Sequence, residues 1–335
     1  LGNQIVRLEP SDGSMQFYPL PWANALQIPV GTQGINYGAS LSNDMTKGAD
    51  GAMWFTLGGL NSIGRIDVQT KEMSKYTIPT LGALYQAGAA LNIIKQGPGN
   101  LVVFIEPLAN KIGAIDVFTK EIKEYNIPTP LSLPSGVNRG PDGAIWFTEA
   151  VAQKIGRIDP ASGKVKGTIA SGPWPAALAW SEAQGVALVA HKAGDTLGVI
   201  DVKEGRLVDA VWVGDEPAAV VVSPDGATAY VSLAKEDAVV VVDIASRAVT
   251  GRVAANKNAT SLALSEDGAT LYVASYCSGV GDRQQFPKDE RNDKFDIAVI
   301  DTATLKVTGY IGEVGSVLGG LLLAGDRLYV ATTRV

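Results

Sequence analysis

Cysteine and histidine are nearly absent from this chain of 335 residues, which contains one of each, Cys277 and His191. A single cysteine excludes an intramolecular disulfide and a cysteine-based zinc site. It also excludes haem attachment through a cysteine pair. A haem-bearing redox protein is therefore not expected.

Long apolar runs and basic clusters are missing as well. No apolar stretch reaches the roughly 18 residues that a membrane-spanning helix requires, so we expect no membrane span. The formal net charge is −6, and the lysines and arginines are scattered along the chain. Because a nucleic-acid-binding surface needs basic residues gathered in a patch or stripe, nucleic acid is not an expected partner.

A sustained helical period is the third absence, and it favours an all-β chain. Hydrophobic residues make up 46% of the chain and charged residues 19%, which is typical of a globular protein with a large core. The chain begins with Leu1 rather than methionine, and we expect it to be a mature or trimmed form.

What the chain does contain is a repeat. A short apolar run that ends in aspartate recurs at Asp67, Asp116, Asp159, Asp201, Asp243 and Asp301. The gaps are 49, 43, 42, 42 and 58 residues. A period of roughly 40–45 residues, built from four short strands, is typical of a propeller blade. The recurring aspartate is expected to accept hydrogen bonds from backbone amides of the turn that follows it, which is a structural role.

The two ends of the chain each hold half a repeat. Residues 315–335 read as two strands, and residues 1–20 read as two more, with Glu9 at the acidic position of the repeat. We therefore predict an all-β, seven-bladed β-propeller of four-stranded blades, a single domain over residues 1–335. The last blade is formed by about 316–335 plus 1–20, which removes open sheet edges.

Three oversized connections are expected on one face of this propeller. They are residues 19–40, 79–92 and 275–295, and each falls between two blades or between the second and third strands of a blade. Strand alternation brings both kinds of connection to the same side. Because long loops on a rigid scaffold often carry function, this face is the predicted site of action.

The residue just after each predicted second strand belongs to a ring on that face. Its occupants are Leu57, Glu106, Glu149, His191, Leu233, Ser275 and Thr332. Two carboxylates and an imidazole on neighbouring blades can hold a divalent ion, magnesium or calcium, or can act as acid and base. The alternative is that they only pack, as a lone histidine often does.

Other side chains of the same connections can contribute. Asp195 and Asn110 lie near the ring positions and can assist a metal or catalytic site. Aromatic residues of that face can line a ligand pocket or simply cap the core, and they are Trp22, Tyr37, Tyr85, Trp174 and Tyr276.

Residues 140–165, with the phrase "DGAIWFTE…KIGRID", and residues 48–80 resemble the virginiamycin B lyase family of seven-bladed propellers. The later blades, at 223–253 and 264–276, resemble the YVTN-type repeats that are common in exported and surface proteins. The chain is a mixture of the two repeat types.

The lyase resemblance implies a magnesium ion and a histidine base that open a cyclic depsipeptide by elimination across its ester. By motif, Glu149 is the family-like position and Glu106 its counterpart one blade earlier, so both are candidate metal ligands. His191 is the candidate base and Glu149 a candidate catalytic residue. The lyases draw histidines from late blades, whereas blades five to seven of this chain contain none.

Two functions follow as alternatives. One is an extracytoplasmic propeller (secreted, periplasmic or on the cell surface), expected to be a monomer and to have lyase-like ancestry. It would bind a small molecule, glycan or protein through the face with the long loops. The other is a magnesium-dependent carbon–oxygen lyase or lactonase. One architecture hosts many functions, so the fold does not decide between them.

Overall fold

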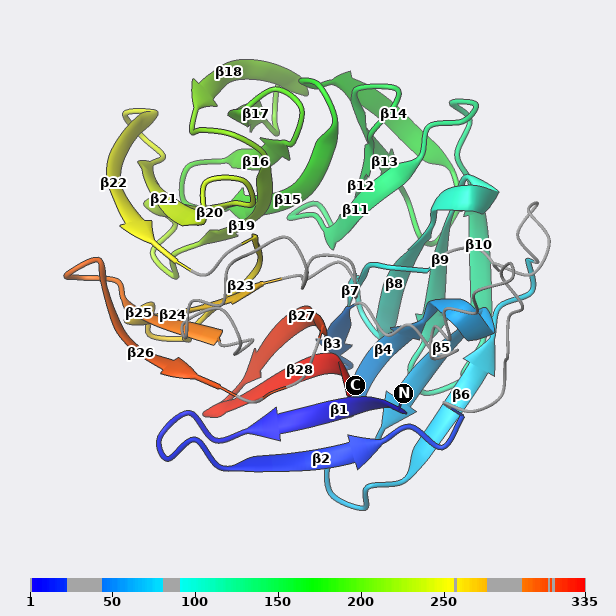
Figure 1. The fold of residues 1–335 in the computed structure, drawn as a ribbon. Coiled ribbons are helices and arrows are strands. Elements are labelled where there is room, and N and C mark those ends of the chain that lie inside the picture. Colours follow the sequence, from blue (N-terminus) through cyan, green and yellow to red (C-terminus); the bar gives the residue numbers. More distant parts are fainter. Residues whose placement is uncertain are drawn as a thin grey trace, which may run out of the picture.

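The computed structural model describes residues 2–22, 44–80, 91–255, 258–275, 297–312, 314 and 317–334. Seven antiparallel sheets of four strands surround a central axis (Figure 1). Two short 3-10 turns, Gly58–Leu60 and Pro107–Ala109, are the helical elements within these ranges. The prediction of an all-β, seven-bladed propeller is confirmed.

The strands of blades 1 to 3 follow the chain order. Blade 1 contains β3 (Met45–Lys47), β4 (Met53–Leu57), β5 (Ser62–Ile66) and β6 (Met73–Thr77). Blade 2 contains β7 (Ile94–Gln96), β8 (Leu101–Glu106), β9 (Lys111–Asp116) and β10 (Ile122–Asn126). Blade 3 contains β11 (Pro134–Arg139), β12 (Ile145–Glu149), β13 (Lys154–Ile158) and β14 (Val165–Ala170).

Blades 4 to 6 repeat this order. Blade 4 contains β15 (Pro175–Ser181), β16 (Val186–His191), β17 (Thr196–Asp201) and β18 (Arg206–Trp212). Blade 5 contains β19 (Pro217–Val222), β20 (Thr228–Leu233), β21 (Ala238–Asp243) and β22 (Ala248–Ala254). Blade 6 contains β23 (Ala259–Leu264), β24 (Thr270–Ser275), β25 (Ile297–Asp301) and β26 (Lys306–Ile311).

The seventh blade joins the two ends of the chain. Its strand order is β2-β1-β28-β27, with β27 (Val317–Ala324) and β28 (Arg327–Arg334) from the C-terminal end and β1 (Gly2–Leu8) and β2 (Met15–Pro19) from the N-terminal end. Strand β28 pairs with β1 from Gly2 opposite Arg334 to Leu8 opposite Leu328. Figure 1 shows the two termini side by side at this pair. The predicted closure, two strands from each end, is confirmed.

The second and third strands of each blade are the most buried, because neighbouring blades cover both of their faces. Strands β4 and β12 are buried at every residue and are rich in aromatic and β-branched side chains, as strands of this kind require. The outer strand β18 is exposed at four of its seven residues. Within the described residues, seven hydrophobic clusters each join two neighbouring blades, so the core lies between blades.

The aspartates that end the third strands cap the turns that follow. Asp67 accepts backbone N–H bonds from Gln69 and Thr70, and Asp116 accepts them from Phe118 and Thr119. These amide donors lower the pKa of both carboxyl groups, Thr70 contributing most for Asp67 and Thr119 for Asp116. Asp159, Asp201, Asp243 and Asp301 accept in the same way. The structural role predicted for the recurring aspartate is confirmed.

No helix among the described residues is long and apolar enough to cross a membrane.

Candidate functional site

We call the face that carries the blade-to-blade connections and the turns between second and third strands the loop face. Hydrogen bonds join the two kinds of connection at the ends of blades 1 to 5. The Asn61 carbonyl accepts from the Ile78 amide, the Asn110 carbonyl accepts from the Ile127 amide, and the Gln153 carbonyl accepts from the Ser171 amide. The shared face predicted from strand alternation is therefore present in the described residues.

Most of the long loops 19–40, 79–92 and 275–295 lie outside the described residues, as do Tyr37, Tyr85 and Tyr276. The other predicted residues are described and lie on or just beneath the loop face.

The three titratable ring residues, Glu106, Glu149 and His191, are fully buried at the loop-face ends of their strands. Glu106 ends β8, Glu149 ends β12 and His191 ends β16. Each shares a strand face with the residue two positions earlier, and Phe104, Phe147 and Val189 at those positions pack against the preceding blade. Each ring side chain is therefore directed into the interface with the blade before it.

His191 has hydrogen-bond partners at both ring nitrogens. The backbone N–H of Gly172 donates to Nε2 at 3.0 Å, and the Ser171 hydroxyl lies 2.9 Å from the same atom. The Thr196 hydroxyl lies 3.0 Å from Nδ1. Because a backbone N–H can only donate, Nε2 is the acceptor and the proton is on Nδ1, which donates to Thr196. Burial lowers the pKa of His191 to about 4, so the ring is neutral at pH 7.

Within the described part of the chain, the carboxyl groups of Glu106 and Glu149 have no hydrogen-bond partners. All four of their oxygens are buried. Burial, and secondarily the charge of Glu124, raises the pKa of Glu106 to about 8 against a weaker opposing effect of Lys111. Glu106 is therefore largely protonated at neutral pH.

The connection above each ring residue explains why His191 has hydrogen-bond partners and Glu149 has none among the described residues. Ser171 and Gly172 lie above His191 in the connection before blade 4. Ile127 and Pro128 are their equivalents in the connection before blade 3, because Ser171 and Ile127 donate to equivalent carbonyls. Isoleucine brings no hydroxyl and proline no N–H, so this connection lacks both donors that His191 uses. Ile78 and Pro79 stand at the same place above Glu106.

The lysine opposite Glu106 across its hairpin is paired elsewhere. Lys111 Nζ lies 2.9 Å from Glu124 Oε2, and Glu124 also accepts from the Thr80 backbone N–H and hydroxyl. The Thr80 hydroxyl is a further Lys111 contact. This network fixes the blade 1–2 connection and leaves the Glu106 carboxyl without a cation partner in the described part of the chain.

Asn110 and Asp195 hold the connections together. The Asn110 amide donates to the carbonyls of Ile127 and Thr129, and its oxygen accepts from the Ser132 amide and hydroxyl. The Asp195 carboxylate accepts from the Glu216 amide at 3.2 Å. Both side chains are thus occupied in clamping the end of one blade to the start of the next.

The two described aromatic candidates differ. Trp22 packs on the hydrophobic cluster between blades 7 and 1, with Lys75 Nζ 5.8 Å from its ring. This contact fits the core-capping alternative. Trp174, between β14 and β15, leaves 40% of its surface exposed on the loop face.

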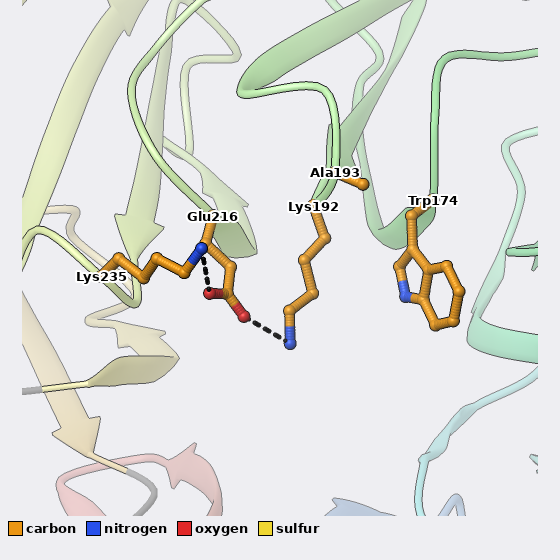
Figure 2. Close-up of a pocket in the computed structure, with 5 residues that line it drawn as sticks. All are labelled: Trp174, Lys192, Ala193, Glu216 and Lys235. Atoms are coloured by element: carbon orange, nitrogen blue, oxygen red, sulfur yellow. Dashed lines mark ion pairs between the residues drawn. The ribbon is translucent and has the colours of Figure 1, made fainter.

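Trp174 lines a cavity of about 290 Å³ together with Lys192, Ala193, Glu216 and Lys235, and we call it the Trp174 pocket. Lys192 Nζ lies 2.9 Å from Glu216 Oε1, and Lys235 Nζ lies 3.5 Å from Glu216 Oε2. Figure 2 shows the carboxylate between the two lysines, with the indole beyond Lys192. All five residues belong to loop-face connections of blades 4 and 5.

Sequence reasoning identified Trp174 but missed the charged side of this pocket. Lys192 directly follows the ring residue His191, and Lys235 follows Leu233 by two residues. Extending the ring comparison by two positions would have found both lysines. Glu216 precedes the first strand of blade 5 exactly as Trp174 precedes that of blade 4, and the same comparison would have placed it.

The Trp174 backbone adopts a left-handed conformation that the fold itself requires. Its φ is 51°, and the residues at the same place before blades 3 and 5, Leu133 and Glu216, have φ values of 50° and 60°. In each case the carbonyl accepts the amide that follows the second strand, donated to Trp174 by Lys192. The conformation is structural, whereas the choice of tryptophan is not.

The phrase that resembles the lyases forms an interlocked unit. Asp142 Oδ1 accepts from Trp146 Nε1 at 2.8 Å, and Arg157 lies over the Trp146 ring at 5.3 Å and 3.4 Å from Asp142. Asp50, Trp54 and Arg65 make the same arrangement in blade 1.

The model of the virginiamycin B lyase family matches residues 37–242, more than half of the chain. The chain belongs to this family. A search of the curated proteins found no match.

Solved structures share the fold of this virginiamycin B lyase family member. A streptogramin B lyase superposes with a TM-score of 0.71 at 17% identity, over 89% of this chain and 95% of that one. A catalytically inactive histidine-to-alanine variant of virginiamycin B lyase from Staphylococcus aureus, with quinupristin, gives 0.71 at 20% identity, over 92% and 98%. Hydrazine synthase from Kuenenia stuttgartiensis gives 0.67 at 15% identity, over 89% and 94%. At these identities the likeness shows the fold alone.

The described residues do not form the magnesium site that the family implies. Among them, no group of three or more histidine, cysteine, aspartate or glutamate side chains is close enough to hold an ion. The oxygens of Glu106 and Glu149 have no described partner and would suit a hard cation. Neither glutamate, however, lies in a described group of three or more histidine, cysteine, aspartate or glutamate side chains. His191 already has partners at both nitrogens.

Proposed function

We propose that this virginiamycin B lyase family member is a ligand-binding propeller that acts through its loop face, with the Trp174 pocket as a binding site. The observation that carries the proposal is the exposed indole of Trp174 in a cavity lined only by loop-face connections. Leu133 and Glu216 occupy the equivalent backbone positions before blades 3 and 5, so packing does not require tryptophan there. Concave sites that combine an aromatic wall with a few polar groups are typical of ligand pockets.

A fragment screen tests this proposal. A chemically diverse fragment library is titrated into isotope-labelled protein, and amide chemical shifts report where each fragment binds. We expect the hits to cluster at the Trp174 pocket and to weaken in Trp174→Leu, which places the leucine of blade 3 at the same position of blade 4. Hits that cluster elsewhere, or that Trp174→Leu leaves unchanged, contradict the proposal.

The second candidate function is the opening of an ester or lactone, with His191 and Glu149 as catalytic residues. Glu106 and Glu149, the predicted ligands of magnesium or calcium, belong to no described group of three or more side chains that could hold an ion. The observation that favours this second function is the pair of buried carboxyls without partners. For His191 to act as the base, Nε2 would have to lose its bond from the Gly172 amide. On this chain's own residues, the binding function has the stronger support.

Quinupristin distinguishes the two functions. The protein is incubated with quinupristin and magnesium or calcium, and the ester-opened product is sought by chromatography, because an intramolecular elimination leaves the mass unchanged. We expect no product. Turnover that Glu149→Gln and His191→Gln both abolish would establish the enzyme instead. Extracytoplasmic placement and a monomeric state stay predictions.

A further inference from the structure

The Trp174 pocket offers a ligand free hydrogen-bond donors and few free acceptors. Both oxygens of the Glu216 carboxylate already form ion pairs with lysines, Oε1 at 2.9 Å from Lys192 Nζ and Oε2 at 3.5 Å from Lys235 Nζ. An ammonium group has three N–H donors, and Lys192 uses one of them on Glu216. The Trp174 indole, which also lines the pocket, is a donor only. A group that accepts hydrogen bonds therefore suits this pocket better than one that donates them.

The two ammonium groups are the accessible charges of the pocket. Two lysines and one glutamate line the cavity, and the Asp215 carboxylate outside the lining pairs with Lys235 at 3.5 Å, so the four charges balance. The hydrogen bond from Lys192 lowers the pKa of Glu216, and the charge of Asp215 raises the pKa of Lys235, so both groups are ionised at neutral pH. The side chains of Lys192 and Lys235 are 43% and 61% exposed against 22% for Glu216, so the ammonium groups are the more accessible.

The backbone of Glu216 is held in place by the fold. The Glu216 amide donates to Asp195 Oδ1, and its carbonyl accepts from the Ala234 amide. The Glu216 carboxylate lies between the ends of Lys192 and Lys235 and pairs with both (Figure 2). Glu216 therefore keeps the two ammonium groups near the same side of the pocket.

The rest of the lining is apolar. Trp174 and Ala193 complete the cavity, whose volume of about 290 Å³ admits a body of one or two rings. An aromatic ring of the ligand can pack on the indole while its acidic group meets Lys192 and Lys235.

We propose that the Trp174 pocket binds a carboxylate attached to a flat apolar body, the chemistry of an aromatic organic acid. This inference rests on the proposed function, because it requires the pocket to be a binding site. The carboxylate accepts charge-assisted hydrogen bonds from Lys192 and Lys235, and the apolar body packs against Trp174.

Isothermal titration with 2-naphthoate and its neutral counterpart 2-naphthamide tests the inference. Two variants remove one side of the pocket each and copy residues of neighbouring blades. Lys192→Ala introduces the alanine that stands at 150 and 234, and Trp174→Leu introduces the leucine at 133. Lys203→Ala, an exposed lysine in the turn between β17 and β18 on the opposite face, is the matched control. Urea unfolding of each variant verifies that it is folded.

We expect 2-naphthoate to bind one site at least about tenfold more tightly than 2-naphthamide, since charge-assisted hydrogen bonds are the stronger kind. Lys192→Ala should remove most of that difference. Trp174→Leu should weaken both probes, and Lys203→Ala should affect neither.

Equal affinities for the two probes, or naphthoate binding that Lys192→Ala leaves unchanged, would overturn the carboxylate inference. If Trp174→Leu still weakens the binding of both probes when the carboxylate inference has failed, the proposed function stands and only the preference for a carboxylate is lost. If both probes bind and Trp174→Leu changes neither affinity, the pocket is not the site and both proposals fail. Absence of naphthoate binding at millimolar concentration overturns the inference, while the fragment screen continues to test the proposed function.

Discussion

Blades 1 and 3 use their Asp-Gly turns differently from blades 5 and 6. Asp50 and Asp142 each bind a buried tryptophan N–H of the following strand and an arginine of the third strand. Asp225 and Asp267 instead accept from the serine and the amide of their own turns. The same dipeptide therefore latches two strands together in one half of the ring and only closes a turn in the other.

A second difference lies in the middle of the blades. In blade 3 the Phe147 ring lies on Gly156, where an added Cβ would come within 2.1 Å of the ring. In blade 5 the paired positions are Val231 and Val240. Blades 1 and 2 repeat the phenylalanine–glycine pair of blade 3. The phenylalanine–glycine pair and the valine–valine pair each fill the space between blades. A valine in place of the glycine, however, does not fit opposite the phenylalanine.

These two comparisons show what the family-like phrase encodes. The aspartate, tryptophan, phenylalanine, glycine and arginine of "DGxxWF…IGR" contact one another rather than a ligand. The phrase therefore specifies blade packing, and it does not by itself specify the chemistry of the loop face.

The largest expected effect comes from breaking one phenylalanine–glycine pair. Gly156→Val should destabilise the protein by about 4–5 kcal/mol, because the new side chain overlaps the fully buried Phe147 ring. The double variant Phe147→Val/Gly156→Val copies blade 5 and should recover a large part of that loss. Urea unfolding measures both. A double variant no more stable than the single one would show that the two pairs are not interchangeable.

Replacing Glu106 by leucine, the residue at the same ring position of blades 1 and 5, should stabilise the protein at alkaline pH. The folded-state pKa of Glu106 is raised from 4.5 to about 8, so the folded state binds the proton more tightly than the unfolded state. Wild-type stability should therefore fall as pH rises from about 4.5 to about 8, by about 4 kcal/mol from this group.

In Glu106→Leu that part of the pH dependence should disappear, as measured by urea unfolding at pH 5 and pH 9. A pH dependence identical to that of the wild type would mean that Glu106 is ionised and has a partner.

Breaking the latch of blade 1 should cost less. Asp50→Ala leaves the buried N–H of Trp54 and the guanidinium of Arg65 without their acceptor, a loss of about 2 kcal/mol. Asp225→Ala, the matched change in blade 5, removes only exposed turn contacts and should cost clearly less than Asp50→Ala. If Asp50→Ala and Asp225→Ala lower the thermal unfolding temperature equally, the aspartates of blades 1 and 5 do not differ in their contribution to stability.

The smallest effect is expected at His191 and in acid. Its folded-state pKa is lowered from 6.5 to about 4, so the stability that the neutral ring contributes is present above pH 6.5 and is lost as pH falls through about 4. Glutamine can accept from the Gly172 amide and donate to Thr196 without titrating. Between pH 7 and pH 5, the free energy of unfolding of His191→Gln should therefore fall by about 1.5 kcal/mol less than that of the wild type. An unchanged acid response in unfolding experiments would contradict the buried, neutral ring.

Much of the architecture could be predicted from the residues alone. The spacing of the third-strand aspartates predicted four-stranded blades, and the half repeats at the two ends predicted the closure through β1 and β28. Such features can be predicted from the sequence because strand period, turn chemistry and repeat length are local properties of the chain. The position of the ring residues followed from the same local count.

The tertiary structure alone decided what the ring residues and the pocket can do. The same ring position holds a histidine with partners at both nitrogens in blade 4 and an unpartnered carboxyl in blade 3, because the connection above them is Ser-Gly in one case and Ile-Pro in the other. Likewise, Trp174, Lys192 and Glu216 become one pocket only when two blades stand side by side. Hydrogen bonding, burial and pKa depend on neighbours distant in the sequence, and a single sequence read along its length does not contain those distances.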